Sequence, residues 1–280
     1  MKFGGHVSIA GGLDRAIERG KDITADCIQI FVAAPQRWLE AKHSDEAVAA
    51  FLAARREASI APILLRGPYL INLGSAEEAL RQRSADAIAS QLEWSDRLGA
   101  MGVVFHVGSF GKEDREIGMS RAAESIAAIL DRSVTSSPLL LETTAGAGNS
   151  IGGRFEDLGE LIERLNQSPR LQVCLDTCHI FAAGYPCTTT ADLDQTMAEF
   201  DRFIGLDRLT ALHLNDSEGT FGSHRDRHAN IGEGQIGLDG FRAIVNHPAL
   251  RKLPGFLEVP GFAGEGPDEE NLRRLRALEA

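Results

Sequence analysis

The chain has 280 residues, of which 43% are hydrophobic, and its formal net charge is −11 at pH 7. This length and apolar content allow one large buried core, so we expect a single domain over residues 1–280. The acidic balance excludes a global cationic field for nucleic acid, so binding of a polyanion would need local basic groups or bound cations.

Short apolar runs alternate with helical stretches along the whole chain, and eight of these runs predict β-strands. The expected strands are residues 2–7, 27–32, 61–66, 102–106, 138–142, 171–176, 209–214 and 255–258. One of the intervening helices has a capping box, Ser75 with Glu78, and ends before Gly99. Eight strands, each followed by a helix, predict an α/β fold: a (β/α)8 TIM barrel with parallel strands inside, helices outside and its chemistry at the C-terminal rim.

Six of the apolar runs end on a residue that can bind a metal or transfer a proton. These residues are His6, His106, Glu142, Asp176, His213 and Glu258. A single histidine at a strand end is more often structural, and a single carboxylate more often caps the next helix. Their repetition at the last five strand ends instead predicts a polynuclear metal site, because the ends of parallel strands meet on one face.

Two further segments at the expected rim add ligand types to this set. In Asp-Thr-Cys-His, His179 follows Asp176 by about one helical turn. In Asp-Arg-His, Asp226 and His228 project to the same side if the chain is extended. Nitrogen and oxygen ligands without cysteine favour Zn²⁺, with Mn²⁺ as a substitute, at an open catalytic site.

The start of the chain has no signal-peptide features, and no apolar run is long enough to span a membrane. None of the four cysteines belongs to a CxxC pair; they are Cys27, Cys174, Cys178 and Cys187. Such cysteines are typical of core thiols in a reducing compartment. We therefore expect a cytoplasmic protein that has no membrane partner and no obligate protein partner.

Several segments resemble endonuclease IV, a family of zinc-dependent apurinic/apyrimidinic endonucleases of base-excision repair. They include Gly-His-Val-Ser-Ile-Ala-Gly-Gly at 5–12, Pro-Tyr-Leu-Ile-Asn-Leu-Gly at 68–74, Asp-Thr-Cys-His at 176–179, His-Leu-Asn-Asp at 213–216 and Ile-Gly-Glu-Gly at 231–234. The motifs follow the family's order from the first strand to the last. The resemblance implies duplex DNA with abasic sites as the partner, and hydrolysis of the phosphodiester 5′ to the lesion to leave a 3′-hydroxyl. Cleaning of blocked 3′ ends is an additional activity that we consider.

The resemblance also implies how three ions are held. One ion has the ligands Glu142, Asp176, His213 and Glu258. A second ion has the ligands His179, Asp226 and His228. The third shares Glu142 with His106 and with a histidine at the position where this chain has Arg66. Glu142, Glu258 and Arg66 are the residues that we expect to act in catalysis.

Arg66 departs from the family pattern, because an arginine stays protonated and cannot ligate a metal. Our hypothesis is two well-held ions and a third of reduced affinity. Alternatively, the guanidinium supplies the missing positive charge and binds phosphate through two parallel hydrogen bonds. If the lost ligand is the cause, Arg66→His should add one equivalent of metal.

A second departure concerns the loop after the second strand. The family places an arginine before Gln-Trp in a loop that enters the duplex, whereas this chain has Gln36, Arg37 and Trp38 in that order. Extended side chains alternate in direction, so Arg37 can point away from DNA. Gln36, Arg37 and Tyr69 are the expected DNA-binding residues, with Tyr69 as a wedge beside the displaced nucleotide.

Two other functions stay open at this point. Glu142, Asp176, His213 and Glu258 alone resemble the metal quartet of sugar isomerases and epimerases with xylose-isomerase-like barrels. The additional ligands His106, His179, Asp226 and His228 favour the nuclease. The second alternative is a DNA-binding pseudoenzyme disabled at Arg66.

Overall fold

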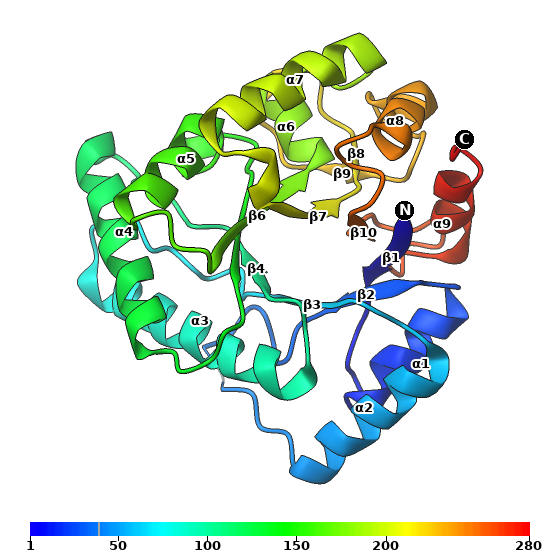
Figure 1. Ribbon diagram of the computed structural model, residues 1–280, viewed down its shortest axis with the longest axis horizontal. Helices are drawn as coiled ribbons and strands as arrows, with labels where there is room; N and C mark the ends of the chain where they lie inside the picture. The colour runs from blue at the N-terminus through cyan, green and yellow to red at the C-terminus, as the bar shows by residue number, and fades with distance from the viewer. Residues whose placement is uncertain (39) are drawn as a thin grey trace.

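The computed structural model describes residues 1–38 and 40–280, and among these residues eight strands close into a parallel barrel surrounded by helices (Figure 1). Around the barrel the order is β1-β10-β7-β6-β5-β4-β3-β2. The strands are β1 Lys2–His6, β2 Cys27–Ile30, β3 Ile63–Arg66, β4 Val103–Phe105, β5 Leu139–Glu142, β6 Leu171–Asp176, β7 Leu209–His213 and β10 Pro254–Leu257. The predicted (β/α)8 TIM barrel is confirmed, and only β10 begins outside its expected range, by one residue.

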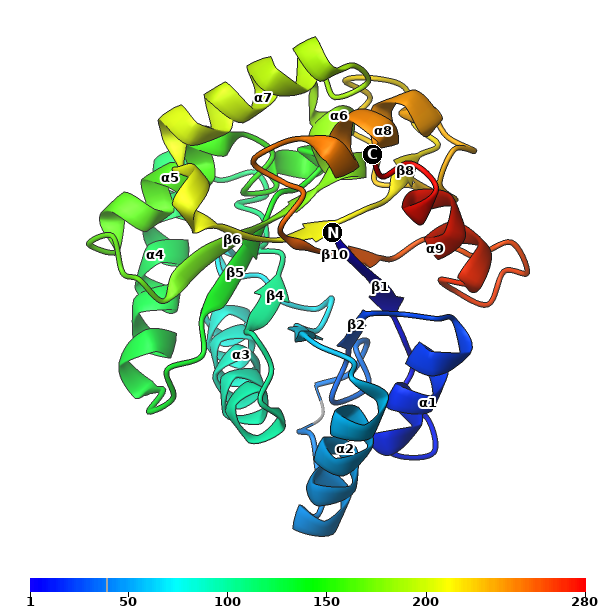
Figure 2. The ribbon, with the colours of Figure 1, turned by 45° about the vertical axis from the view of Figure 1, so that its right-hand side comes forward.

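The helices lie on the outside of the barrel, as the two ribbon views show (Figures 1 and 2). They are α1 Asp14–Asp22, α2 Asp45–Ala58, α3 Glu78–Leu98, α4 Arg115–Arg132, α5 Phe155–Arg164, α6 Thr177–Ala183, α7 Thr190–Phe203, α8 Gly237–Asn246 and α9 Glu269–Arg276, with short 3₁₀ turns η1 Ala147–Asn149 and η2 Leu206–Arg208. None of these helices is long and apolar enough to cross a membrane.

The ends of α3 confirm one expectation and correct another. Gly99 ends the helix in the left-handed conformation, with φ of 59°, a region that glycine adopts without a steric penalty. The predicted capping box of Ser75 and Glu78 is wrong. The Ser75 hydroxyl accepts the backbone N–H of Glu77, which makes a local turn before the helix, and Glu77 is the N-cap residue.

Side chains that point into the barrel form two layers, because residues two apart on a strand face the same side. The first layer is apolar and consists of Cys27, Leu64, Val104, Leu140, Cys174, Ala211 and Phe256. Two residues further along the same strands come Gln29, Arg66, His106, Glu142, Asp176, His213 and Glu258. The barrel therefore places a polar layer at the strand ends, directly above an apolar one.

The long loop after β7 contains an antiparallel pair that the sequence did not predict, β8 Asp216–Ser217 and β9 His228–Ala229. The buried carboxylate of Asp216 organises this loop by accepting the backbone N–H groups of Gly232 (2.9 Å), Gly234 (3.0 Å) and Ile236 (2.9 Å). The loop carries Asp226 and His228, so these hydrogen bonds help to fix both side chains at the rim.

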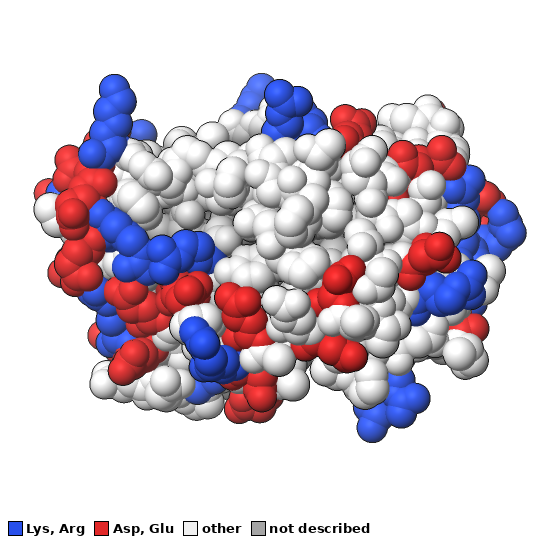
Figure 3. All heavy atoms as spheres, turned by 90° about the horizontal axis from the view of Figure 1, so that it is seen from above, with Lys and Arg blue, Asp and Glu red and all other residues white. Residues whose placement is uncertain are grey.

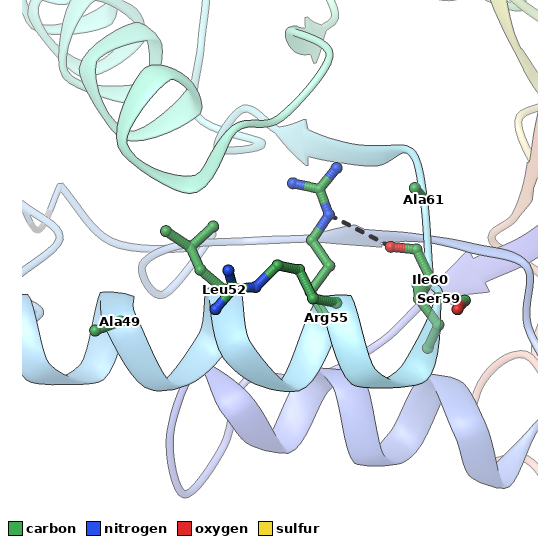
Figure 4. A pocket seen from close by; sticks show the side chains of 7 residues that line it. Ala49, Leu52, Arg55, Ser59, Ile60 and Ala61 are labelled. Carbon is green, nitrogen blue, oxygen red and sulfur yellow. Dashed lines mark hydrogen bonds between the residues drawn. The ribbon is translucent and has the colours of Figure 1, made fainter.

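A hollow beside α2 lies at the end of the barrel where β3 begins, away from the polar layer (Figure 4). Its lining includes Leu52, Arg55 and Ile60, and the Arg55 Nε–H donates to the Ile60 carbonyl at 3.4 Å. Ile60 precedes the first residue of β3, whereas the polar layer stands at the ends of the strands. This hollow is therefore separate from the polar layer.

Gly4 of β1 lies where β1 and β2 approach each other very closely. A Cβ at this position would overlap the carbonyl oxygen of Cys27 in β2. We expect Gly4→Ala to lower the free energy of unfolding by about 3 kcal/mol or more, because backbone atoms cannot move aside as a side chain can. Lys2→Ala, on the exposed start of the same strand, should cost less than about 1 kcal/mol. Equal losses in urea denaturation would contradict this packing.

Candidate metal centre

The ends of β5, β6, β7 and β10 bring together four of the expected ligands. Their ligand atoms all lie within 4.8 Å of one another, and the residues are Glu142, Asp176, His213 and Glu258. The Nδ1 atom of His213 is 2.8 Å from Glu142, 3.7 Å from Asp176 and 3.6 Å from Glu258. One imidazole nitrogen therefore faces three carboxylates, an arrangement that suits a divalent cation. We refer to these four residues as the quartet.

A second group combines α6 with the loop after β7. The Nε2 atoms of His179 and His228 lie 3.1 and 3.2 Å from the same oxygen, Oδ1 of Asp226. His179 is buried at the start of α6, and Asp226 is the more exposed member. We refer to these three residues as the triad.

The histidines of both groups are oriented by their second ring nitrogen. Each of these nitrogens faces an uncharged oxygen: His213 Nε2 faces Oε1 of Gln29 at 2.8 Å, His179 Nδ1 the Thr143 carbonyl at 2.8 Å, and His228 Nδ1 the Glu258 carbonyl at 3.2 Å. An oxygen acceptor requires an N–H donor, so the other nitrogen retains its lone pair in the neutral imidazole. Metal-ligating histidines are commonly oriented in this way.

The Nε2 atoms of His179 and His228 also fit a metal site because of how they are paired. Among the described residues, the buried Nε2 atoms of His179 and His228 have no hydrogen-bond partner. Both face Oδ1 of Asp226, at 3.1 and 3.2 Å. Buried polar atoms are normally paired, so two lone pairs turned toward one carboxylate fit a site for a cation. The nitrogen and oxygen donors fit zinc, and Mn²⁺ is also compatible.

The charges of the centre shift the pKa values of its members strongly. Burial lowers the pKa of His179, but Asp176 and Asp226 outweigh that effect and raise it to about 10. Burial raises the pKa of Glu142, yet Arg66, His106 and His213 hold it well below its usual range. Glu142 thus remains ionised and attracts positive charge. Metal binding to such imidazoles displaces protons.

Of the third expected group, His106 and Glu142 come together with Arg66 beside them, and His179, which was expected only in the triad, joins them. His106, Glu142 and His179, which we call the His106 group, carry ligand atoms within 4.8 Å of one another. Arg66 donates to the Glu142 carboxylate through Nη1 and lies 3.4 Å from Glu258 through Nε. Its side chain is only 3% exposed, so the guanidinium is a component of the centre itself.

Gln29 and Asn215 are site residues that sequence reasoning did not select. The Gln29 amide group donates to Glu258 at 2.6 Å and contacts His6 Nδ1 at 3.0 Å. The Asn215 amide donates to Asp176 at 2.7 Å. Gln29 was detectable as the polar residue in an otherwise apolar strand. His6 Nδ1 also lies 3.8 Å from Oε1 of Glu258.

Cys178 lies near Asp176 and His228 but fits the expectation of a core thiol. The side chain is buried, and its Sγ–H donates to the Arg227 carbonyl at 3.6 Å. Burial raises the pKa of the thiol to about 12, which keeps it protonated and a poor metal ligand.

The expected DNA-binding residues lie on the rim loops after β2 and β3. Tyr69 is 60% exposed, and its ring meets Phe31 edge to face at 5.2 Å. Gln36 and Arg37 are also exposed. Arg37 lines a cavity of about 200 Å³ together with Pro68 and part of α3. The Arg66 guanidinium lies 6.0 Å from the centre of the Tyr69 ring. Tyr69 therefore stands beside the metal centre, whereas Arg37 lies toward α3.

Comparison with known proteins agrees with the fold. The family described as Xylose isomerase-like TIM barrel matches residues 17–278. A protein of Chloroflexus aggregans named Probable endonuclease 4 is 41% identical over 278 residues, which cover 99% of this chain and 97% of the relative. Endonuclease IV from Thermus thermophilus superposes with a TM-score of 0.85 at 36% identity, covering 99% of this chain and 98% of that one.

A sugar-enzyme structure shares the fold at much lower identity. A D-tagatose 3-epimerase-like protein has a TM-score of 0.70 at 16% identity, covering 99% of this chain and 97% of that one. This likeness shows the fold alone, and the chain falls in the class of xylose isomerase-like TIM barrels. Within that class, the full-length matches show that the chain belongs to the endonuclease IV family, a family of nucleases.

Asp216 offers a test of how the triad is supported. We expect Asp216→Asn to lower the free energy of unfolding by about 2 to 4 kcal/mol, because the amide loses the charge and one acceptor oxygen facing several N–H groups. The loosened loop should also retain less zinc at the triad after dialysis. Asp207→Asn, on the exposed turn η2, is the matched control. Full zinc content and full stability in Asp216→Asn would show that the loop does not depend on this carboxylate.

Proposed function

We propose that the protein is a DNA-repair endonuclease that hydrolyses the phosphodiester 5′ to abasic sites in duplex DNA and leaves a 3′-hydroxyl. The observation that carries this proposal is the triad, a second ligand group adjoining the quartet. His228 Nε2 lies 3.7 Å from Asp176 of the quartet, so ions in the two groups would share one substrate. Paired ions of this kind serve phosphodiester hydrolysis.

The quartet and the triad would each hold one divalent ion, with zinc as the expected metal. Bound ions lower the pKa of water and stabilise charge on the attacking and leaving oxygens. Gln29, Thr143 and Asn215 would keep the ligands aligned through the hydrogen bonds already described. Cleaning of blocked 3′ ends would use the same groups on a different DNA terminus.

The triad also favours the nuclease over a sugar isomerase or epimerase. Proton or hydride transfer on a sugar needs the quartet but makes no use of a second ligand group 3.7 Å away. The epimerase-like neighbour, at 16% identity, shares the fold and supports nothing further about chemistry.

Attraction to DNA would come from the rim rather than from the overall surface. On the side seen in Figure 3, Lys and Arg side chains alternate with Asp and Glu, and no continuous basic face appears. At the rim, exposed Tyr69 and Trp38 offer aromatic surfaces, and Arg37 offers a positive charge. Such a rim can contribute to the free energy of DNA binding in two ways, by stacking on exposed bases and by neutralising phosphates.

Glu142→Gln tests the proposed activity. A duplex with one abasic analogue should be incised by the wild-type protein, and a chelator should abolish incision. Glu142→Gln should be slower by a factor on the order of 10³ or more, because Glu142 contributes ligand atoms to both the quartet and the His106 group. Glu57→Gln, exposed on α2, should keep the wild-type rate. Incision that persists in chelator would contradict a metal-dependent mechanism.

Tyr69→Ala tests the proposed wedge. We expect roughly 5- to 150-fold weaker binding to the abasic duplex, which corresponds to the loss of one stacking contact. Binding to an intact duplex should change much less, because no base is displaced there. Ile117→Ala, an exposed apolar residue of α4, serves as the control. Equal weakening for both duplexes would mean that Tyr69 contacts DNA without recognising the lesion.

A further inference from the structure

Arg66 is the one strongly basic side chain among the described residues of the inward-facing polar layer. It follows Leu64 of the apolar layer by two residues on β3, so the barrel directs it inward. The side chain is 3% exposed and the carboxylate of its partner Glu142 is fully buried. A charge so deeply placed is tolerated only when opposite charges surround it.

The polar contacts of the guanidinium with other described residues go to candidate metal ligands. Nη1 donates to Oε2 of Glu142, Nε lies 3.4 Å from Oε1 of Glu258, and Nη2 lies 3.5 Å from Nε2 of His106. The oxygen of Glu258 is also held by Gln29 at 2.6 Å. Arg66 is thus held by contacts with Glu142, Glu258 and His106. It links the quartet to the His106 group, formed by His106, Glu142 and His179.

The position of Arg66 conflicts with an ion in the His106 group. His106 Nε2 lies 3.1 Å from Oε2 of Glu142, the oxygen to which Arg66 donates. An ion bound between His106 and Glu142 would have to share that oxygen with a guanidinium. Arginine does not release its proton in proteins, so the repulsion could not be relieved by deprotonation.

We propose that the Arg66 guanidinium is a resident cation of this centre, which takes the place of an ion beside Glu142 and His106 and holds Glu142 and Glu258 in position for the ions of the quartet and the triad. The centre then contains four carboxylates (Glu142, Asp176, Asp226 and Glu258), one guanidinium and two divalent ions. This role rests on the proposed use of divalent ions, but it does not depend on which DNA lesion is cut.

The same contacts argue against direct phosphate binding by Arg66. Nη1 donates to Glu142 and Nη2 faces His106, whereas Nε makes no hydrogen bond to a described residue but lies 3.4 Å from Glu258. A phosphate would have to displace these groups to reach the guanidinium. Arg66 is therefore a positioning residue that acts through the carboxylates. Its removal should change the number of bound ions and the stability gained from them, which a purely structural arginine would not do.

The test is metal content by elemental analysis after dialysis against trace zinc. Wild type should retain two zinc ions per chain, and Arg66→His should retain three, because a neutral imidazole replaces the guanidinium with a ligand. Arg251→His is the matched control, since it adds a histidine on the exposed surface before β10, and it should retain two. Three tightly bound ions in wild type, or two in Arg66→His, would overturn the proposal.

A thermal measurement keeps the proposal testable if Arg66→His folds poorly. Without metal, Arg66→Met should melt about 5 to 10 °C below wild type, because two buried carboxylates lose their counter-charge. Added zinc should then raise the melting temperature of Arg66→Met by more than that of wild type. Equal zinc-induced shifts would contradict a cationic role for Arg66. Metal content and melting temperature are measured without DNA. The Arg66 proposal can therefore be wrong while the protein still cuts at abasic sites, and it can be right while the protein does not cut them.

Discussion

The burial of negative charge at the strand ends is the constraint on which the rest of this structure depends. Glu142 and Asp176 are fully buried, and Glu258 is nearly so. Carboxylates in such surroundings are costly unless cations and hydrogen bonds compensate them. Arg66 supplies one positive charge, and the histidines present lone pairs where further cations would bind. The carboxylates of the centre therefore need positive charge, of which Arg66 supplies one part and bound cations would supply the rest.

The barrel makes this arrangement feasible because its inward side chains come in layers. Leu64, Leu140 and Phe256 fill the first layer, so that the polar layer above them is closed to water from below. Small inward residues, Cys174 and Ala211, lie under Asp176 and His213. The apolar layer thus supports the ligands from beneath, while the rim loops close over them with Asp226 and His228 from above.

Much of this could be predicted from the sequence, because the fold and the candidate ligands at the strand ends follow from short-range patterns. The grouping of four of these ligands into the quartet came from the resemblance to endonuclease IV. An apolar run that ends in a ligand indicates a strand end, and parallel strands bring such ends together. Gln29 was missed because it stands within a strand rather than after one, although it faces the same layer. The β8–β9 pair was missed because Asp216 organises it through backbone groups 16 to 20 residues away. The capping box at Ser75 failed because the local pattern also fits a turn.

We propose that two divalent ions and one arginine together compensate the carboxylates of a DNA-cutting centre. Anomalous diffraction from crystals of the zinc-loaded protein would locate these ions. We expect two full peaks, one within the quartet and one within the triad, with the Arg66 guanidinium still between Glu142 and Glu258. A third full peak between His106 and Glu142, with Arg66 turned away from the centre, would contradict it.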